Sequence, residues 1–292
     1  MIFGFHPDAV IFTMIDQLTL VIVSFNSGHL LIERLEQLRD FNITVIDNAS
    51  HDGSPATIKQ RFPTVHLIES EHNLGFGRAA NLGLKSVTTP YALLLNPDVE
   101  TTPHDIEALL SHVNTITDTW LFLAPNTGTA PKLSEHQSQT SLGRISFASG
   151  CALLFNVESF LALEGFDENI FLFFEETDLC KRAENLGYSM YYAQHISFPH
   201  EAGSSVENVD NLSAIKIWHY HWSRLYFCKK HRMWLTLTHL LIKSLLSYPL
   251  KLLLTSKGEK KLIYRMRHAA AIDFISRKPA FKKDGLPTSP LT

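Results

Sequence analysis

Apolar residues in the first third of the chain alternate between continuous runs and helical spacings. Residues 18–24 form an apolar run typical of a strand buried on both faces, and residues 30–38 follow with apolar side chains spaced as on a helix. Further strands are predicted at 43–47, 65–68 and 91–96, and further helices at 54–61 and 75–87. This repeated strand–helix order predicts an α/β fold with a mostly parallel sheet and helices on both of its faces.

The pattern beyond residue 120 predicts a less regular second half. Strand character returns at 145–155 and at 188–196, on either side of a helix predicted at 175–186. Residues 126–144 are polar and aperiodic, which is typical of a surface loop that acts as a lid or acceptor contact, or simply tolerates insertion. A second polar stretch at 201–213 precedes a helical tail. We therefore expect an N-terminal extension at 1–17, a main α/β domain at 18–231 and a helical region at 232–292.

Composition narrows the class of protein. The chain has 292 residues, of which 45% are hydrophobic, so it is long and apolar enough to bury a large core and is not disordered. Its three cysteines, an odd number without CxxC spacing, favour a reducing, cytoplasmic compartment over a disulfide framework. Residues 1–17 lack a basic segment followed by a long apolar run, so we expect neither a signal peptide nor a spanning helix there.

Charge is distributed unevenly along the chain. Residues 1–215 hold 10 Lys and Arg against 26 Asp and Glu, whereas residues 216–292 hold 16 against 3. Within the basic part, residues 234–254 are strongly apolar but are interrupted by His239, Lys243, Pro249 and Lys251. This mixture favours a helix lying on an anionic membrane surface over a nucleic-acid contact or a membrane span. The alternative is a helical subdomain that packs its apolar face on the main domain.

Polar clusters accompany the ends of three predicted strands. Ser24 and Asn26 follow the first strand, Asp47 ends the second, and Asn96 and Asp98 close the strand at 91–96. The carboxyl ends of parallel strands meet at one edge of a sheet, and ligands bind at that edge in such folds. We therefore expect these side chains to converge there.

The polar residues of these clusters have functional and structural interpretations. Asp47 could accept a hydrogen bond from the N3–H of a uracil or thymine ring, or it could cap the following turn. Ser50, Asp52 and Ser54 are more typical of capping residues. Asp98 could bind a divalent cation together with the phosphates of a substrate, or it could merely stabilise its own turn.

Residues 73–81 predict a glycine-rich turn that opens a helix. Gly75 and Gly77 permit close backbone approach, and the free N–H groups at a helix start favour phosphate. The spacing is neither GxGxxG nor a Walker loop, so the motif alone is weak. Arg78 could contact a pyrophosphate or a base, or it could be a solvated helix residue.

Carboxylates gather beside aromatic residues at 165–182. Burial near phenylalanines would raise the pKa of a carboxyl group and a nearby cation would lower it, which is the balance that a general base requires. Glu175, Asp178 and Arg182 recur at helical spacing, so Asp178 and Arg182 could form a surface pair, whereas Glu176 is freest to face a cleft. His200 follows the next predicted strand, and a single His is more often structural than a ligand.

Seven segments of the chain together resemble the inverting family 2 glycosyltransferases, and within them the rhamnosyltransferase-type subgroup. The similarity spans about residues 18–231, with the segments in the family's order. They read VIVSFNS at 21–27, DNASHDGS at 47–54, NLGFGRAAN at 73–81, LLLNPDV at 93–99, SGCALLF at 149–155, GFDENIFLFFEETDLCKRAENLGY at 165–188 and HEAGSS at 200–205.

The resemblance implies a GT-A fold, a nucleotide-sugar donor and a Mg²⁺ or Mn²⁺ ion. It implies that Asp47 contacts the donor base, Asp98 holds the metal, His200 contacts the metal or the diphosphate, and Glu176 is the catalytic base. The remaining donor contacts that it implies are Ser24, Asn26, Asn73, Gly75, Arg78, Asn81, Asn96 and Gly150. The residues that fall in acceptor or supporting positions are Glu175, Asp178 and Arg224.

The sequence departs from the family pattern at two positions. Glu176 stands where the family usually has Asp, and its extra methylene could shift the base by about an ångström, enough to affect the attack geometry. Asn96 stands where other members have a first Asp, although an NPD motif is familiar in this subgroup.

The resulting hypothesis is an inverting transferase of bacterial surface glycan synthesis. It would move L-rhamnose from deoxythymidine diphosphate, or a sugar from a UDP donor, to a lipid-linked or saccharide acceptor at the inner face of the plasma membrane. One alternative is a nucleotidyltransferase, although the glycine- and lysine-rich triphosphate loop expected after Ser24 is missing. Another is a non-catalytic nucleotide-sugar-binding module of a glycan assembly complex.

Overall fold

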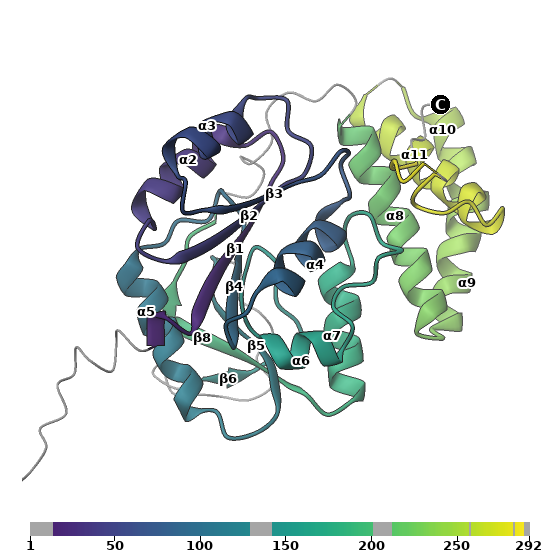
Figure 1. Cartoon of the computed structure of the whole chain (residues 1–292). Helices are drawn as coiled ribbons and strands as arrows, with labels where there is room; N and C mark the ends of the chain where they lie inside the picture. The colour runs from purple at the N-terminus through teal and green to yellow at the C-terminus, as the bar shows by residue number, and fades with distance from the viewer. Residues whose placement is uncertain (1–13, 129–141, 201–211, 257, 283, 289–292) are drawn as a thin grey trace, which may run out of the picture. The chain divides into compact units, whose positions relative to one another are not determined.

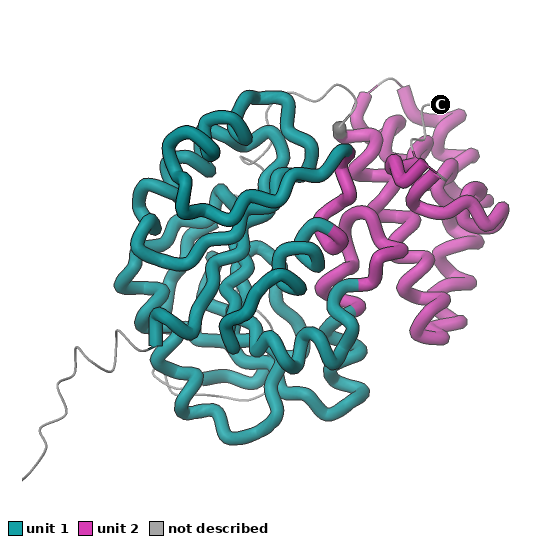
Figure 2. Tube along the Cα trace, in the orientation of Figure 1, with its two compact units in different colours: residues 1–71, 79–166, 179–207 teal, residues 72–78, 167–178, 208–292 magenta. Residues whose placement is uncertain are grey.

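The computed structural model describes residues 14–128, 142–200, 212–256, 258–282 and 284–288. Its contacts divide the chain into two compact units, which Figure 2 colours separately. The first unit comprises residues 1–71, 79–166 and 179–207, and the second comprises residues 72–78, 167–178 and 208–292. This division differs from the expected boundary at 231–232, because two short central segments and residues 208–231 group with the C-terminal helices.

The first unit is built on an eight-stranded sheet in the order β3-β2-β1-β4-β7-β5-β8-β6 (Figure 1). The strands are β1 (Leu18–Ser24), β2 (Asn42–Asp47), β3 (His66–Glu69), β4 (Tyr91–Leu95), β5 (Trp120–Asn126), β6 (Gly143–Arg144), β7 (Ala152–Asn156) and β8 (Ser189–Ser197). β1 is parallel to β2 and β4, and β5 is parallel to β8, whereas β7 runs antiparallel between β4 and β5. The carboxyl ends of β1, β2, β4, β5 and β8 therefore lie at one edge of the sheet.

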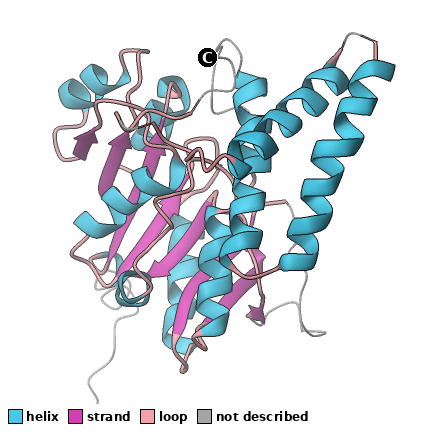
Figure 3. Cartoon of the chain, turned by 90° about the vertical axis from the view of Figure 1, so that its right-hand side faces the viewer, coloured by secondary structure: helices cyan, strands magenta, loops and turns pink. Residues whose placement is uncertain are grey.

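Helices cover both faces of this sheet, as Figures 1 and 3 show. On one face, Leu20 and Ile22 of β1 share a core cluster with apolar side chains of α2 (Gly28–Gln37), α3 (Ser54–Arg61) and α5 (Pro103–Ser111). On the other face, α4 (Phe76–Ser86) approaches β1 so closely that a Cβ on Gly83 would lie 2.5 Å from Val21. Successive strand residues point to opposite faces, which explains why every residue of β1 is buried.

Short elements complete the first unit. They are the 3₁₀ helix η1 (His112–Thr115), α6 (Val157–Ala162) and α7 (Glu175–Asn185), whose first residues belong to the second unit. Phe155 of β7, Phe160 of α6 and Phe166 pack edge to face, with ring centroids 4.9 to 6.1 Å apart. These aromatic contacts fix the chain that leaves the sheet before α7.

The second unit is helical. Its helices are α8 (Leu212–Lys230), α9 (Trp234–Ile242), the π-helical η2 (Lys243–Ser247), α10 (Tyr248–Leu254) and α11 (Glu259–Ile275). One apolar cluster joins Trp218 and Trp222 of α8 to Met266 and Ala270 of α11 and to Phe171. The segment 167–178 thus shares a core with the C-terminal helices.

The structure confirms the predicted α/β fold and most of its elements. Residues 54–61 are helical as predicted, and the strands predicted at 18–24, 43–47, 65–68, 91–96 and 188–196 lie within two residues of β1, β2, β3, β4 and β8. The strand predicted at 145–155 is wrong in extent, since regular pairing begins only at Ala152. Residues 1–13, 129–141 and 201–211, which include most of both polar stretches, lie outside the described residues.

Candidate functional site

The carboxyl edge of the sheet brings together the predicted residues of β1, β2, β4 and β8. Ser24 and Asp47 are register partners at the ends of β1 and β2. His200 follows β8 and bridges to Val99 in the turn beyond β4. The backbone N–H of Asn96 donates to the carbonyl of Cys151 at 2.8 Å, which brings the turn at Gly150 to the same edge. The predicted convergence of these strand ends is confirmed.

The two carboxylate oxygens of Asp47 have different surroundings. Its Oδ2 accepts a hydrogen bond from the backbone N–H of Ser50 at 3.0 Å, which is the expected turn-capping contact. Its Oδ1 is buried and accepts no hydrogen bond from any residue that the structure describes. A buried acceptor without a donor is unfavourable, so this oxygen fits a ligand N–H such as the N3–H of a uracil or thymine ring.

The loops after β1 and β2 are tied to each other. Asn26 donates its backbone N–H to Ser50 Oγ at 3.0 Å and accepts the N–H of His51 on Oδ1 at 2.8 Å. Asp52 accepts the Gly28 N–H at 2.8 Å, and hydrogen bonds from Ser54 contribute to lowering its pKa against the opposing effect of burial. Asp52 also accepts the Ser54 N–H at 3.0 Å, so its predicted role in capping the turn is confirmed, whereas α3 has Gly53 at its N-cap and no side-chain capping bond. These contacts hold the loops that flank Asp47.

Ser24 has a structural role. Its side chain is fully buried, and its hydroxyl shares a hydrogen bond of 2.9 Å with the Ser27 hydroxyl. The structure thus places Ser24 under the loop rather than at a ligand-facing position.

Asp98 and His200 lie close together at this edge. The Asp98 side chain is 1% exposed, and its Oδ1 lies 3.2 Å from Nε2 of His200, which is 18% exposed. Both Asp98 oxygens are buried, and no residue in the described part of the chain donates a well-aligned hydrogen bond to either. An uncompensated buried carboxylate is costly, so this arrangement fits a group that binds a cation.

The donor set at Asp98 is small. Among the described residues, no group of three or more His, Cys, Asp or Glu side chains could hold a metal ion. A hard cation often uses one or two protein ligands and completes its coordination with water and substrate phosphates. The residues present fit a cation bound in that way, with Asp98 and His200 as the protein ligands.

Glu175 and Glu176 open α7 within the second unit. The Glu175 side chain is buried, and burial first, followed by the neighbouring charge of Glu176, raises the pKa of Glu175 well above its usual value. This shift favours the protonated form of the Glu175 carboxyl group. Glu176 is half-buried beside it. The raised pKa expected for the base is therefore found at Glu175. The position of Glu176 beside the sheet edge stays a prediction.

The turn before these glutamates is strained. Phe173 and Phe174 have φ angles of 65° and 73°, a left-handed conformation that non-glycine residues rarely adopt. The turn is held by α8, since Ser223 Oγ donates to the Leu172 carbonyl at 3.0 Å and the Phe174 ring lies 5.4 Å from that of Tyr220. Strain of this kind is concentrated at functional sites, where surrounding contacts maintain it.

Asp178 is paired with the end of α8. Its carboxylate is fully buried and lies 2.8 Å from both Lys230 Nζ and His231 Nε2. Lys230 also donates to Asp167 at 2.6 Å. The alternative of a surface position for Asp178 is therefore wrong, and Arg182 of the same helix donates to the carbonyls of Leu163 and Gly165. Sequence reasoning missed Lys230 and His231, although the basic run at 229–232 offered a signal.

The glycine-rich turn serves the second unit's own packing. Asn73 Oδ1 accepts the Gly75 N–H at 2.9 Å, and a Cβ on Gly75 would lie 2.1 Å from the Phe171 carbonyl oxygen. Arg78 donates to the Glu168 carbonyl at 2.6 Å, and its guanidinium lies 3.4 Å from the centroid of the Phe281 ring. The close approach that the glycine permits is therefore to Phe171, and the alternative of a solvated Arg78 is wrong.

Two other predicted residues are buried or half-buried. Asn81 is 1% exposed, and its amide both donates to and accepts from the backbone of Phe166 at 2.9 Å. Asn81 thus anchors the turn before α7 and does not face a ligand. Arg224 is half-buried on α8, and its positive charge contributes to lowering the pKa of His221.

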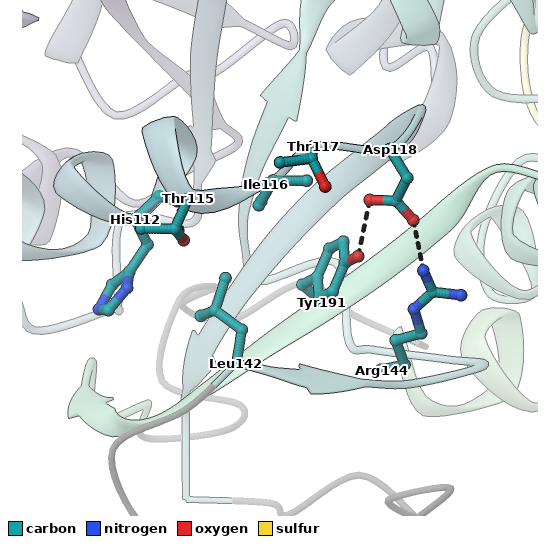
Figure 4. A pocket seen from close by; sticks show the side chains of 8 residues that line it. All are labelled: His112, Thr115, Ile116, Thr117, Asp118, Leu142, Arg144 and Tyr191. Atoms are coloured by element: carbon teal, nitrogen blue, oxygen red, sulfur yellow. Dashed lines mark hydrogen bonds and ion pairs between the residues drawn. The ribbon is translucent and has the colours of Figure 1, made fainter.

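A pocket of about 420 Å³ lies at the amino ends of β5 and β8 (Figure 4). Asp118 there accepts hydrogen bonds from Tyr191 and Ser189 and pairs with Arg144, and these contacts lower its pKa against the opposing effect of burial. This end of the sheet is opposite to the edge that carries Asp47 and Asp98. None of the predicted site residues lines the pocket.

Solved structures define the class of protein to which this fold belongs. The chain is 14% identical to a mannosyltransferase from Pyrobaculum calidifontis in complex with GDP-Man and Mn²⁺, covering 90% of this chain and 73% of that one with a TM-score of 0.54. It is 13% identical to GalNAc-T7 with UDP, GalNAc and Mn²⁺, covering 90% of this chain and 58% of that one with a TM-score of 0.59. The fold is that of the GT-A glycosyltransferases.

Sequence comparison then gives the family. Residues 19–160 match glycosyl transferase family 2. Over 271 residues the chain is 24% identical to an N-acetylglucosaminyl-diphospho-decaprenol L-rhamnosyltransferase of Mycobacterium tuberculosis, covering 76% of this chain and 87% of the relative. The chain is a glycosyltransferase with a family 2 domain, which confirms the resemblance to rhamnosyltransferases of that family.

Proposed function

We propose that this glycosyltransferase moves a sugar from a nucleoside diphosphate to a hydroxyl group of a glycan acceptor, with inversion at the anomeric carbon. The observation that carries the proposal is the buried Asp98 carboxylate, without hydrogen-bond donors among the described residues and 3.2 Å from His200. It lies at the same sheet edge as Asp47. Binding of a nucleoside diphosphate requires a contact to its nucleobase and a carboxylate that holds the cation bound to its phosphates.

The donor is bound at the edge of the sheet. Asp47 Oδ1 accepts the N3–H of the base, while the loop contacts of Asn26 and Asp52 hold the neighbouring turns in place. Asn96 and Gly150 flank the diphosphate side of this edge, where their turns meet. Asp98 and His200 hold a Mg²⁺ or Mn²⁺ ion, which supplies positive charge to the departing diphosphate when bound.

Glu176 acts as the general base of the transfer. It takes the proton of the acceptor hydroxyl as that oxygen attacks the anomeric carbon, and the bond to the diphosphate breaks in the same step. Because burial and the neighbouring charge raise the pKa of Glu175, the negative charge of the pair is favoured on Glu176. A single displacement of this kind inverts the anomeric carbon and requires no covalent sugar–enzyme intermediate.

The favoured donor is deoxythymidine diphosphate L-rhamnose, with a UDP-sugar as the alternative. The mycobacterial relative named above supports rhamnose and a lipid-linked acceptor. Thymine and uracil both present the N3–H that Asp47 would accept, so this contact does not separate the two nucleotides. The product would serve bacterial surface glycan synthesis. The family 2 domain supports catalysis over the alternative of a non-catalytic module.

A donor screen tests the proposal directly. The full chain is incubated with individual nucleoside diphosphate sugars, with and without Mg²⁺ or Mn²⁺, and release of the nucleoside diphosphate is measured. We expect release from one donor class that a divalent cation stimulates and that an acceptor glycan increases. Release that a chelator does not affect would contradict the role of Asp98, and no release from any thymidine or uridine donor would contradict the role of Asp47.

A further inference from the structure

The helix Trp234–Leu254, formed by α9, η2 and α10, exposes one apolar face. Leu235, Ile242, Leu246, Leu250 and Leu253 recur at intervals of seven, four, four and three residues, which places them on one side of the helix. Leu235 is 91% exposed and Leu253 is 84% exposed. Contiguous exposure of this kind marks an interaction surface. We call these five residues the apolar face.

The opposite side of the same helix is packed within the second unit. Leu237 and Leu240 are buried in a cluster with Leu225 of α8 and Ala271 of α11. The Ser244 hydroxyl is buried and is hydrogen-bonded to His221 Nε2 of α8 at 2.7 Å. One side of the helix therefore has its partners inside the unit, and the apolar face points away from them.

Positive charges border the apolar face. Lys243 and Lys251 are exposed on the same helix, and α11, which packs beside α10, adds the exposed Lys260 and Lys261. No Asp or Glu occurs anywhere in the sequence from 211 to 258. Glu259, at the start of α11, is the one exposed carboxylate beside these lysines in the described residues 212–261. An apolar strip on a helix that carries lysines and no carboxylate is complementary to an anionic lipid surface, because the side chains insert while the lysines reach the headgroups.

The packing distinguishes a helix lying on a membrane from one crossing it. With 21 residues the helix is long and apolar enough to span, by length and composition. However, Lys243 and the buried Ser244–His221 pair lie near its middle. A spanning helix would draw the lysine-bearing α11, which packs on α10, into the hydrocarbon. In-plane insertion keeps these charges in water.

We propose that the apolar face inserts into the anionic inner leaflet of the plasma membrane, with Lys243 and Lys251 at the headgroups, and holds the enzyme as a peripheral protein on the cytoplasmic side. The face belongs to the same unit as Glu175 and Glu176. A glycosyltransferase docked in this way meets an acceptor whose lipid is embedded in the same leaflet. Docking itself requires no catalytic step, so it can be tested independently of the proposed donor and acceptor.

Vesicle flotation of the full chain tests the proposal. The vesicles are phosphatidylcholine alone or an equal mixture of phosphatidylcholine and phosphatidylglycerol. We expect binding to the mixture that weakens with salt, and weak binding to phosphatidylcholine alone. Combining Leu235→Ser, Ile242→Ser, Leu246→Ser and Leu253→Ser is expected to weaken binding at least about a hundredfold. Combining Lys243→Gln and Lys251→Gln is expected to weaken it about thirtyfold.

Matched variants in the first unit control for lost surface hydrophobicity and charge. Leu82→Ser, Phe147→Ser, Leu161→Ser and Leu186→Ser remove four exposed apolar side chains, and Lys59→Gln with Lys181→Gln removes two charges. Neither set should change flotation by more than about twofold.

Three outcomes would overturn the proposal. Binding that is unaffected by the serine variants, or equal on both vesicle types, would exclude the apolar face or the electrostatic component. Dimerisation without vesicles that the serine variants abolish would assign the face to a second copy of the chain. Resistance of membrane-bound protein to extraction with alkaline carbonate would assign the helix to a membrane span.

Discussion

Acidification is expected to destabilise the helical unit through two buried histidines of α8. His219 is fully buried, with its ring 4.5 Å from that of Phe171, and burial lowers its pKa to about 3. Burial, followed by the charges of Arg267, Arg224 and Lys243, lowers the pKa of His221 to about 3 as well. An unfolded histidine titrates near 6.5. The stability that neutral histidines contribute is therefore complete above pH 6.5 and is lost progressively as the pH falls toward 3.

The magnitude follows from these pKa values. At about pH 5, each histidine that must stay neutral in the fold reduces the free energy of unfolding by about 2 kcal/mol relative to neutral pH. The two together amount to about 4 kcal/mol, which is roughly a quarter or more of the stability of about 5–15 kcal/mol that is typical of a domain. The helical unit should therefore unfold at distinctly lower urea concentrations at about pH 5.

Urea unfolding followed by tryptophan fluorescence measures this effect, because Trp218 and Trp222 lie in the apolar core cluster of the helical unit. His219→Phe should remove about half of the stability difference between neutral pH and about pH 5. His239→Phe, at an exposed position of α9, should leave that difference unchanged. An equal pH dependence in the wild type and in His219→Phe would refute the reasoning.

Four further predictions concern the site and its support. Glu176→Gln should reduce kcat for nucleoside diphosphate release by about a hundredfold to ten-thousandfold, because it removes the base. Asp98→Asn should weaken Mn²⁺-dependent donor binding, measured by calorimetry, by about tenfold or more. Gly75→Ala should lower the free energy of unfolding by about 2 kcal/mol or more, since its Cβ would meet the Phe171 carbonyl oxygen at 2.1 Å. Lys230→Met should lower it by about 3 kcal/mol, because the Asp178 carboxylate is fully buried.

Each of these variants has a matched control. Glu175→Gln removes a carboxyl group whose raised pKa disfavours the charged form, so it should keep kcat within about tenfold; an equal loss in both glutamate variants would contradict the proposed assignment of the base. Asp118→Asn, at the other end of the sheet, should not change Mn²⁺ binding. Gly53 has a φ of 80°, but a Cβ added there would have no neighbour within 4 Å. Gly53→Ala should therefore introduce the backbone strain of Gly75→Ala without its steric clash. Lys181→Met removes an exposed pair and should cost less than about 1 kcal/mol.

The fold could be predicted where burial dictates the sequence. β1 is apolar at nearly every position because both of its faces are covered, and the helix predicted at 54–61 is α3, which has Pro55 in its first turn. The antiparallel insertion of β7 between β4 and β5 could not be predicted, because hydrophobic periodicity carries no information on strand direction.

The site was predictable in part. Asp47 and Asp98 follow apolar strands, so the topology itself brings their ends to one edge. The sequence could not show that Asn81 turns inward to Phe166, or that Lys230 reaches Asp178 across 52 positions of the chain. Such contacts depend on how distant segments pack, and local pattern does not specify that packing.

The left-handed conformation of Phe173 and Phe174 links the proposed base Glu176 to the C-terminal helices. Such backbone angles are unfavourable by about 1–2 kcal/mol per residue, and the partners that enforce them here include Ser223 and Tyr220 of α8. A chain truncated before α8 would lose these partners, so we expect the bend to relax and Glu176 to lose its orientation. If the proposed roles hold, such a deletion should abolish sugar transfer more strongly than it weakens donor binding.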